Sequence, residues 1–195
     1  MNKVEISLND LPIASPGVPV YLISTISKDD IRNIAPYGMV MPVSYNPLIY
    51  AIGSDKDRDT YRNIVETEEF VSNVPSTSML EKVNLTGIKF PTDIDEFEKA
   101  KFTPTPAFQV KLPLIAECRS HFECKLLNIY EITKTRVIIV GEVVAVFNRS
   151  GFIFEEFCQT KGTIRSFVLC SRSLFWIRKV CRKKVINKLI GVNIN

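Results

Sequence analysis

The stretch Val137-Ile-Ile-Val-Gly-Glu142-Val-Val-Ala-Val-Phe147 is the longest apolar run in this chain of 195 residues. Its many β-branched residues are typical of a buried or half-buried β-strand. The run is interrupted by Glu142 and is much shorter than the roughly 20 apolar residues that a helical membrane span requires. It therefore predicts a strand in a globular core, and we expect no membrane span.

Shorter runs of similar character lie on both sides of this strand. We expect further strands at residues 18–24, 39–43, 48–52, 70–74 and 123–129. Two short helices fit between them, at residues 59–66 and 76–83, each with an acidic residue or a serine at its start. Strands that are numerous and closely spaced predict a mainly β fold with short helices, either a barrel or a sandwich.

The composition is that of an ordinary globular domain, with 46% hydrophobic, 24% charged and 10% aromatic residues. Near the N-terminus, Glu5 stands where a secretory signal would begin its apolar core, so we expect a cytoplasmic protein. The chain has five cysteines, no Cys-x-x-Cys pair and a single histidine, His121. Neither a disulfide framework nor a metal site is indicated.

The net charge of +4 is distributed unevenly along the chain. From Gly151 onward there are nine basic and two acidic side chains, whereas residues 1–150 contain 16 basic and 19 acidic ones. We therefore expect a domain at 1–150 followed by a basic C-terminal tail at 151–195. One interpretation of the tail is an amphipathic basic arm at 164–184 for a membrane surface or nucleic acid.

The segment Ser54-Asp-Lys-Asp-Arg-Asp-Thr60-Tyr-Arg-Asn63 follows one predicted strand and opens a predicted helix. The free backbone N–H groups of a helix start, together with Ser54, Arg58 and Thr60 as donors, outline a phosphate site. The three aspartates oppose this role unless they point away. A calcium loop is a weaker alternative, since Thr60 stands where such a loop requires glycine. A capped helix start with solvated charges is a third interpretation.

A larger set of motifs, in order along residues 12–148, resembles the flavin reductase-like FMN-binding proteins. The motifs are Asn33-Ile-Ala-Pro-Tyr37-Gly-Met-Val-Met-Pro42-Val-Ser44-Tyr-Asn-Pro47-Leu, Arg58-Asp-Thr60-Tyr-Arg-Asn63-Ile, Phe70-Val-Ser-Asn73-Val-Pro75, Lys101-Phe-Thr103-Pro104, Pro113-Leu-Ile-Ala-Glu117-Cys, His121-Phe-Glu123-Cys and Gly141-Glu142-Val. The resemblance implies an FMN-binding split β-barrel that forms a homodimer, with the flavin near the subunit interface.

The resemblance also implies which residues bind the flavin. The stretch along the isoalloxazine ring and ribityl chain corresponds to Asn33, Ala35, Pro36 and Tyr37. The adjacent strand, whose backbone meets the flavin edge, corresponds to Pro42, Val43 and Ser44. The residues that bind phosphate or order its loop correspond to Ser54, Arg58, Thr60 and Asn63. No catalytic residue is assigned, because hydride transfer occurs at the cofactor.

The resemblance ends at the tail, which gives the tail a second interpretation. One allowed codon choice for Arg165–Cys181, read one nucleotide later, encodes Asp-Pro-Leu-Phe-Tyr-Val-Val-Gly-Arg-Tyr-Phe-Gly-Leu-Gly-Lys-Phe, which resembles the family's C-terminal segment. A frameshift near Gly151 would account for the abrupt basic charge and for three late cysteines without any partner.

Two functions of different classes follow from the sequence. The first is an FMN flavoprotein of the NAD(P)H:flavin oxidoreductase type, which takes electrons from NAD(P)H or another donor. The second is a non-catalytic β-barrel that binds nucleic acid or a membrane through a basic surface or tail. The balance of −3 over residues 1–150 disfavours nucleic acid as a partner.

Overall fold

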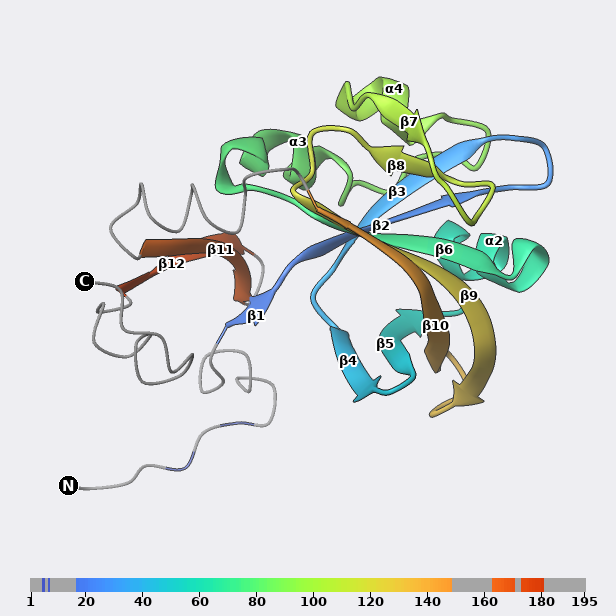
Figure 1. Ribbon diagram of the computed structural model, residues 1–195, viewed down its shortest axis with the longest axis horizontal. Coiled ribbons are helices and arrows are strands. Elements are labelled where there is room, and N and C mark those ends of the chain that lie inside the picture. Colours follow the sequence, from blue (N-terminus) through green and yellow to red (C-terminus); the bar gives the residue numbers. More distant parts are fainter. Residues whose placement is uncertain (1–4, 6, 8–16, 149–162, 171–172, 181–195) are drawn as a thin grey trace, which may run out of the picture.

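The computed structural model describes residues 5, 7, 17–148, 163–170 and 173–180. Its main feature is a seven-stranded antiparallel sheet with the order β3-β2-β6-β9-β10-β5-β4 (Figure 1). The strands are β2 (Tyr21–Ile26), β3 (Arg32–Tyr37), β4 (Val40–Tyr45), β5 (Leu48–Asp55), β6 (Glu69–Val74), β9 (Ser120–Glu131) and β10 (Arg136–Asn148). A short hairpin pairs β7 (Pro104–Pro106) with β8 (Pro113–Ile115).

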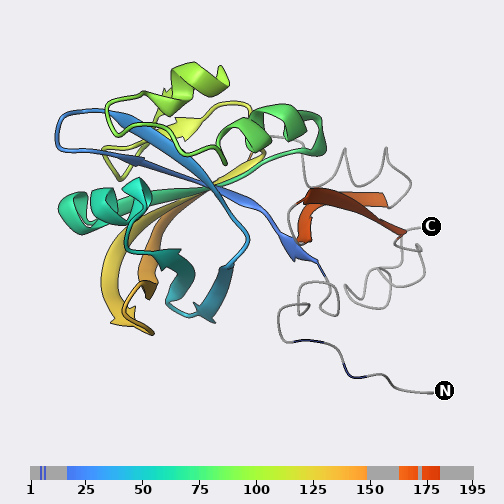
Figure 2. The same cartoon turned by 180° about the vertical axis from the view of Figure 1, so that it is seen from behind.

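The helices are short and lie outside the sheet. They are α2 (Asp59–Thr67), the 3₁₀ turn η2 (Thr77–Met79), α3 (Leu80–Leu85) and α4 (Glu96–Ala100). Seen from both sides, α3 and α4 lie near one end of the sheet and the β4–β5 hairpin lies at the other (Figures 1 and 2). Within the described residues, none of the helices combines the length and apolar character needed to cross a membrane.

Two hydrophobic clusters stabilise this arrangement. The larger is centred on Ile52, Ile64, Phe70 and Ile139, and the smaller joins strands β2 and β3 to the helices α3 and α4. Gly141 allows the closest approach, because a Cβ atom there would lie 2.5 Å from the ring of Phe70. The register of β10 against β9 shifts at two places, as β-bulges do where a sheet bends.

The expected mainly β fold is confirmed, and each strand predicted in the body lies within or overlaps an observed one. Both predicted helices are present, although the second is divided into η2 and α3. Strand β3 and helix α4 were not predicted. In β3, Asn33 and Pro36 lower the β-propensity, whereas α4 has only five residues.

A second sheet has the order β1-β11-β12, formed by β1 (Val18–Pro19), β11 (Thr163–Cys170) and β12 (Ser173–Val180). The backbone of the expected basic arm is therefore extended at 163–170 and 173–180. The proposed frameshift point near Gly151 and the rest of the tail lie outside the described residues.

Candidate functional site

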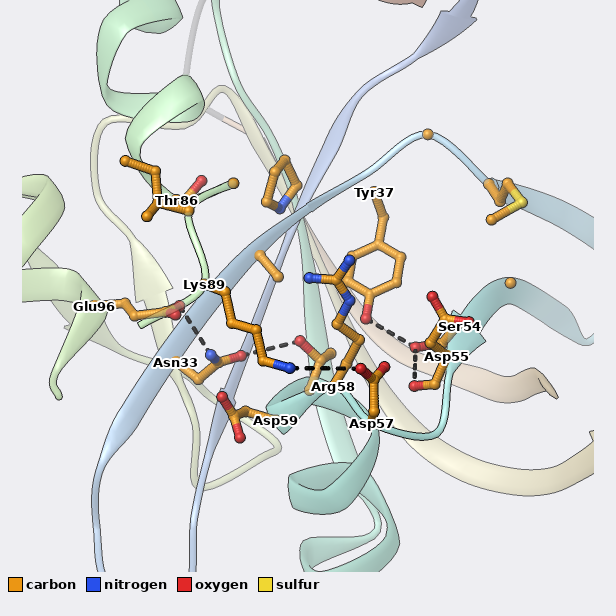
Figure 3. Close-up of a pocket in the computed structure, with 18 of the residues that line it drawn as sticks. Asn33, Tyr37, Ser54, Asp55, Asp57, Arg58, Asp59, Thr86, Lys89 and Glu96 are labelled. Atoms are coloured by element: carbon orange, nitrogen blue, oxygen red, sulfur yellow. Dashed lines mark hydrogen bonds and ion pairs between the residues drawn. The ribbon is translucent and has the colours of Figure 1, made fainter. Parts of the chain in front are cut away.

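A cavity of about 280 Å³ opens between strand β3, the turn from β5 into α2, and the loop that follows α3 (Figure 3). This volume is close to the lower end of the range for small-molecule sites. The lining residues used below are Asn33, Ala35, Pro36, Tyr37, Gly53, Ser54, Asp55, Asp57, Arg58, Asp59, Thr60, Lys89, Glu96 and Arg136, together with others from residues 86–90.

The N-terminus of α2 is available to an anion. Arg58 is the N-cap residue, has an extended backbone (φ −85°, ψ 142°) and makes no side-chain capping hydrogen bond. The backbone N–H groups of the first helical turn have no partner within their own helix, and the helix dipole adds positive potential there. The start of this nine-residue helix therefore has the chemistry of a phosphate-binding site.

The three aspartates around Arg58 do not oppose this role, because each is paired with a cation. The pairs are Asp55 with Arg136 at 2.7 Å, Asp57 with Lys89 at 3.5 Å, and Asp59 with Arg62. Arg58 itself forms no ion pair with any acid in the described part of the chain, and its side chain is exposed. A positive charge is thus left available at the mouth of the cavity.

The floor of the cavity contains a buried tyrosine. The hydroxyl group of Tyr37 lies 2.9 Å from Ser54 Oγ, and Ser54 Oγ donates to the carbonyl oxygen of Asp55 at 3.2 Å. Tyr37 therefore donates to Ser54, since each hydroxyl carries one hydrogen. Burial raises the pKa of Tyr37, so the phenol stays neutral and its ring is held against the cavity.

A buried polar network fixes the side chain of Asn33. Its Oδ1 accepts hydrogen bonds from Thr60 Oγ1 at 3.0 Å and Thr25 Oγ1 at 3.3 Å, while its Nδ2 donates to Glu96 Oε2 at 2.8 Å. Asn63 lies behind this network and donates to Thr25 Oγ1 at 3.1 Å. The hydroxyl hydrogen of Thr60 is therefore used inside the protein, where it orders Asn33.

Glu96 is a buried carboxyl group on the cavity wall. Its Oε2 also accepts the backbone N–H of Ile34 at 2.7 Å. Burial is the main cause that raises the pKa of Glu96 to about 7, and the nearby Asp59 and Asp95 add to this rise, although the Ile34 hydrogen bond opposes it. The side chain is thus partly protonated near neutral pH.

Seven of the eleven residues predicted to bind the flavin line this one cavity: Asn33, Ala35, Pro36, Tyr37, Ser54, Arg58 and Thr60. Asn63 is buried behind them. Pro42, Val43 and Ser44 lie on the outer strand β4, where the register against β5 shifts between Pro42 and Ser44, and they do not line the cavity.

Sequence reasoning missed Glu96, Lys89, Arg136 and Gly53 in this cavity. One sequence signal was present near Glu96: Asp95 is a typical N-cap residue and could have predicted the start of α4. In the structure its side chain accepts the N–H of Glu98. His121, the single histidine of the sequence, is not among the residues that line this cavity. Its Nδ1 lies 2.9 Å from Asn73 Oδ1, which already accepts the N–H of Ile115. His121 therefore donates this hydrogen bond, and burial lowers its pKa, which favours the neutral imidazole.

Comparison with known proteins relates the chain to flavoproteins. A family model described as "Flavin reductase like domain" matches residues 15–162. An uncharacterised protein of Methanothermobacter thermautotrophicus is 49% identical over 114 residues, which are 58% of this chain and 54% of that protein. The matched part of the chain thus spans about half the length of this relative.

Solved structures show the same fold. The 2-nitrobenzoate 2-nitroreductase of Pseudomonas fluorescens is 26% identical with a TM-score of 0.78, over 92% of this chain and 93% of that one. An FMN-binding protein of Thermus thermophilus is 16% identical with a TM-score of 0.72, over 92% of this chain and 96% of that one. A protein with a split barrel domain from Shewanella frigidimarina is 22% identical with a TM-score of 0.73, over 85% of this chain and 84% of that one. The split-barrel fold implied by the family resemblance is thereby confirmed.

Proposed function

We propose that this chain is an FMN-binding flavoprotein of the NAD(P)H:flavin oxidoreductase type. The chain belongs to the flavin reductase-like domain family, whose model matches residues 15–162. A flavin-related oxidoreductase role follows from the family. We propose three finer points: that the cofactor is FMN, that it binds in the cavity described above, and that NAD(P)H is the electron donor. Bound FMN would supply the hydride chemistry, and the residues of the chain would bind it, orient it and exclude water.

The observation that carries the proposal is Arg58, which has no acidic partner among the described residues and stands at the start of α2, where its side chain does not cap the helix. A flavin phosphate is the group that this combination of one cation and free N–H groups would bind. The neighbouring aspartates are neutralised by Arg136, Lys89 and Arg62, so they leave the positive potential in place. We assign Arg58 and the helix N-terminus to the phosphate, and Thr60 and Asn63 to the ordering of Asn33.

The other predicted contacts extend the ligand away from the phosphate. Ala35, Pro36 and Tyr37 follow one another on β3 and provide a mostly apolar wall against which a planar ring could pack. Pro42, Val43 and Ser44 lie on β4, outside the cavity of a single chain. In our proposal they reach the flavin edge when the site is completed by a second copy.

A homodimer is the second part of the proposal. Apolar side chains of the β3–β4 turn and of strands β4 and β10 are exposed in the single chain: Met39, Met41, Val43, Tyr45, Val144 and Val146, from 37% to 83%. An apolar surface of this kind commonly marks a protein interface. A second copy placed over β4 would cover it and close the cavity.

Flavin titration tests the proposal. FMN fluorescence should be quenched at micromolar protein, and denaturation of the saturated protein should release it. NADH or NADPH added to the complex should bleach the flavin absorbance if either is the donor. An unchanged flavin spectrum throughout the titration would refute the proposal. The alternative function, nucleic-acid or membrane binding through basic residues after Gly151, predicts such an unchanged spectrum.

A further inference from the structure

Glu96 presents one oxygen that the protein does not use. The side chain is only 6% exposed, and both hydrogen bonds from the protein, from Asn33 Nδ2 and the Ile34 N–H, are accepted by Oε2. Oε1 accepts no hydrogen bond from the described residues. Since Glu96 lines the cavity, Oε1 is an acceptor that a ligand in the cavity can use.

Asn33 presents the complementary donor beside it. Its Oδ1 is occupied by Thr25 and Thr60, and this fixes the amide with Nδ2 toward Glu96. An amide nitrogen carries two hydrogens, and only one has an acceptor among the described residues. Asn33 also lines the cavity, so an acceptor and a donor stand next to each other, as Figure 3 shows.

A hydroxyl group matches this pair, because it donates one hydrogen bond and accepts others. A phosphate does not match it, since the ionised form of Glu96 would repel a second anion. In Figure 3, Glu96 and Asn33 lie at the opposite side of the cavity from Ser54 and Asp55. Thr60, in the first turn of α2, donates to Asn33 Oδ1, so the cavity offers a hydroxyl site at Glu96 and Asn33 beside the anion site at Arg58.

We propose that Glu96 and Asn33 bind a hydroxyl group of the ligand's ribityl chain, with Glu96 Oε1 accepting and Asn33 Nδ2 donating. This inference rests on the proposed function, because the ribityl chain belongs to the flavin. Glu96 is then a residue that selects flavins carrying a polyol over flavins that lack one.

The test compares riboflavin with lumiflavin, in which a methyl group replaces the ribityl chain, so that neither ligand has a phosphate. The variant Glu96→Gln keeps an oxygen that can accept from Asn33 and Ile34, and places an amide N–H group where Oε1 was. The matched control is Glu98→Gln, which removes the same charge from an exposed position on the same helix.

At about pH 8, where Glu96 is mostly ionised, we expect Glu96→Gln to weaken riboflavin binding about tenfold, the effect of one charge-assisted hydrogen bond, and to change lumiflavin binding less than twofold. Glu98→Gln should change neither. Equal losses for both ligands, or riboflavin affinity within twofold of the wild type, would overturn the inference.

A measurement on the wild-type chain does not depend on the folding of any variant. Riboflavin should bind at least about tenfold more tightly than lumiflavin. Equal affinities would overturn the hydroxyl site while leaving flavin binding intact. If the wild-type chain binds none of FMN, riboflavin and lumiflavin, the proposed function fails and this inference fails with it.

Discussion

Replacement of Arg58 by alanine tests the phosphate site most directly. Arg58 is the cation left without an acidic partner among the described residues of the cavity, so its removal breaks no ion pair there. A charge-assisted hydrogen bond contributes about 1.5–3 kcal/mol. Because the Arg58 side chain is exposed, we expect the lower end, about 1.5 kcal/mol, which is about a tenfold loss of FMN affinity.

The assay is a fluorescence titration of wild type and Arg58→Ala with FMN and with riboflavin, which form a thermodynamic cycle. Riboflavin lacks the phosphate, so its affinity should be unchanged, and the FMN effect should shrink as salt is raised. Lys28→Ala is the control and should not change FMN affinity, since Lys28 is exposed, pairs with Glu66 of helix α2 and does not line the cavity. Equal losses of FMN and riboflavin, or no loss of FMN, would refute the assignment.

Four further predictions concern stability, assembly and the tail. Gly141→Ala should lower the free energy of unfolding by about 1–3 kcal/mol in urea titrations, because its Cβ would clash with the Phe70 ring. Burial raises the folded-state pKa of Glu96 from 4.5 to about 7, so the wild type should lose stability relative to Glu96→Gln as the pH rises from about 4.5 to about 7. If the difference in free energy of unfolding between the two proteins is the same at about pH 5 and at about pH 7.5, this prediction is wrong. Met41→Asp should convert a dimer into a monomer in light scattering, since it places an unpaired charge in the proposed interface, and an unchanged mass would exclude that face. Resequencing the codons for residues 148–153 should reveal the frameshift, and an intact frame in an independent isolate would remove the hypothesis.

The sequence predicted the sheet well because its strands carry strong local signals. The β-branched run of β10 and the shorter runs of β5, β6 and β9 predict strands from the local sequence alone. Strand β3 lacks such a signal, since Asn33 and Pro36 are poor strand formers, and its pairing with β2 decides its conformation. That pairing is a tertiary effect, which local propensity does not contain.

The same distinction applies to the cavity. Asn33, Tyr37 and Arg58 could be predicted because they belong to recognisable motifs, and the structure brings them together. Glu96 is 63 positions away from Asn33 along the chain, in a helix of five residues, and nothing local separates it from the exposed Glu98 two residues later. Only the packing of α4 on β3 makes one of these two carboxyl groups part of the site.

Long-range ion pairs explain why the segment at 54–63 had three interpretations. The three interpretations, a calcium loop, a solvated helix start and a phosphate site, differ in the groups that the three aspartates contact. Two of the cations that pair with these aspartates, Lys89 and Arg136, come from distant parts of the chain. Arg136 arrives because β10 pairs with β5, opposite Asp55. The register of β10 against β5 therefore places Arg136 beside Asp55, and this ion pair neutralises the aspartate and preserves the positive potential at Arg58. A change that shifts this register should alter phosphate binding without touching any residue of the α2 N-terminus.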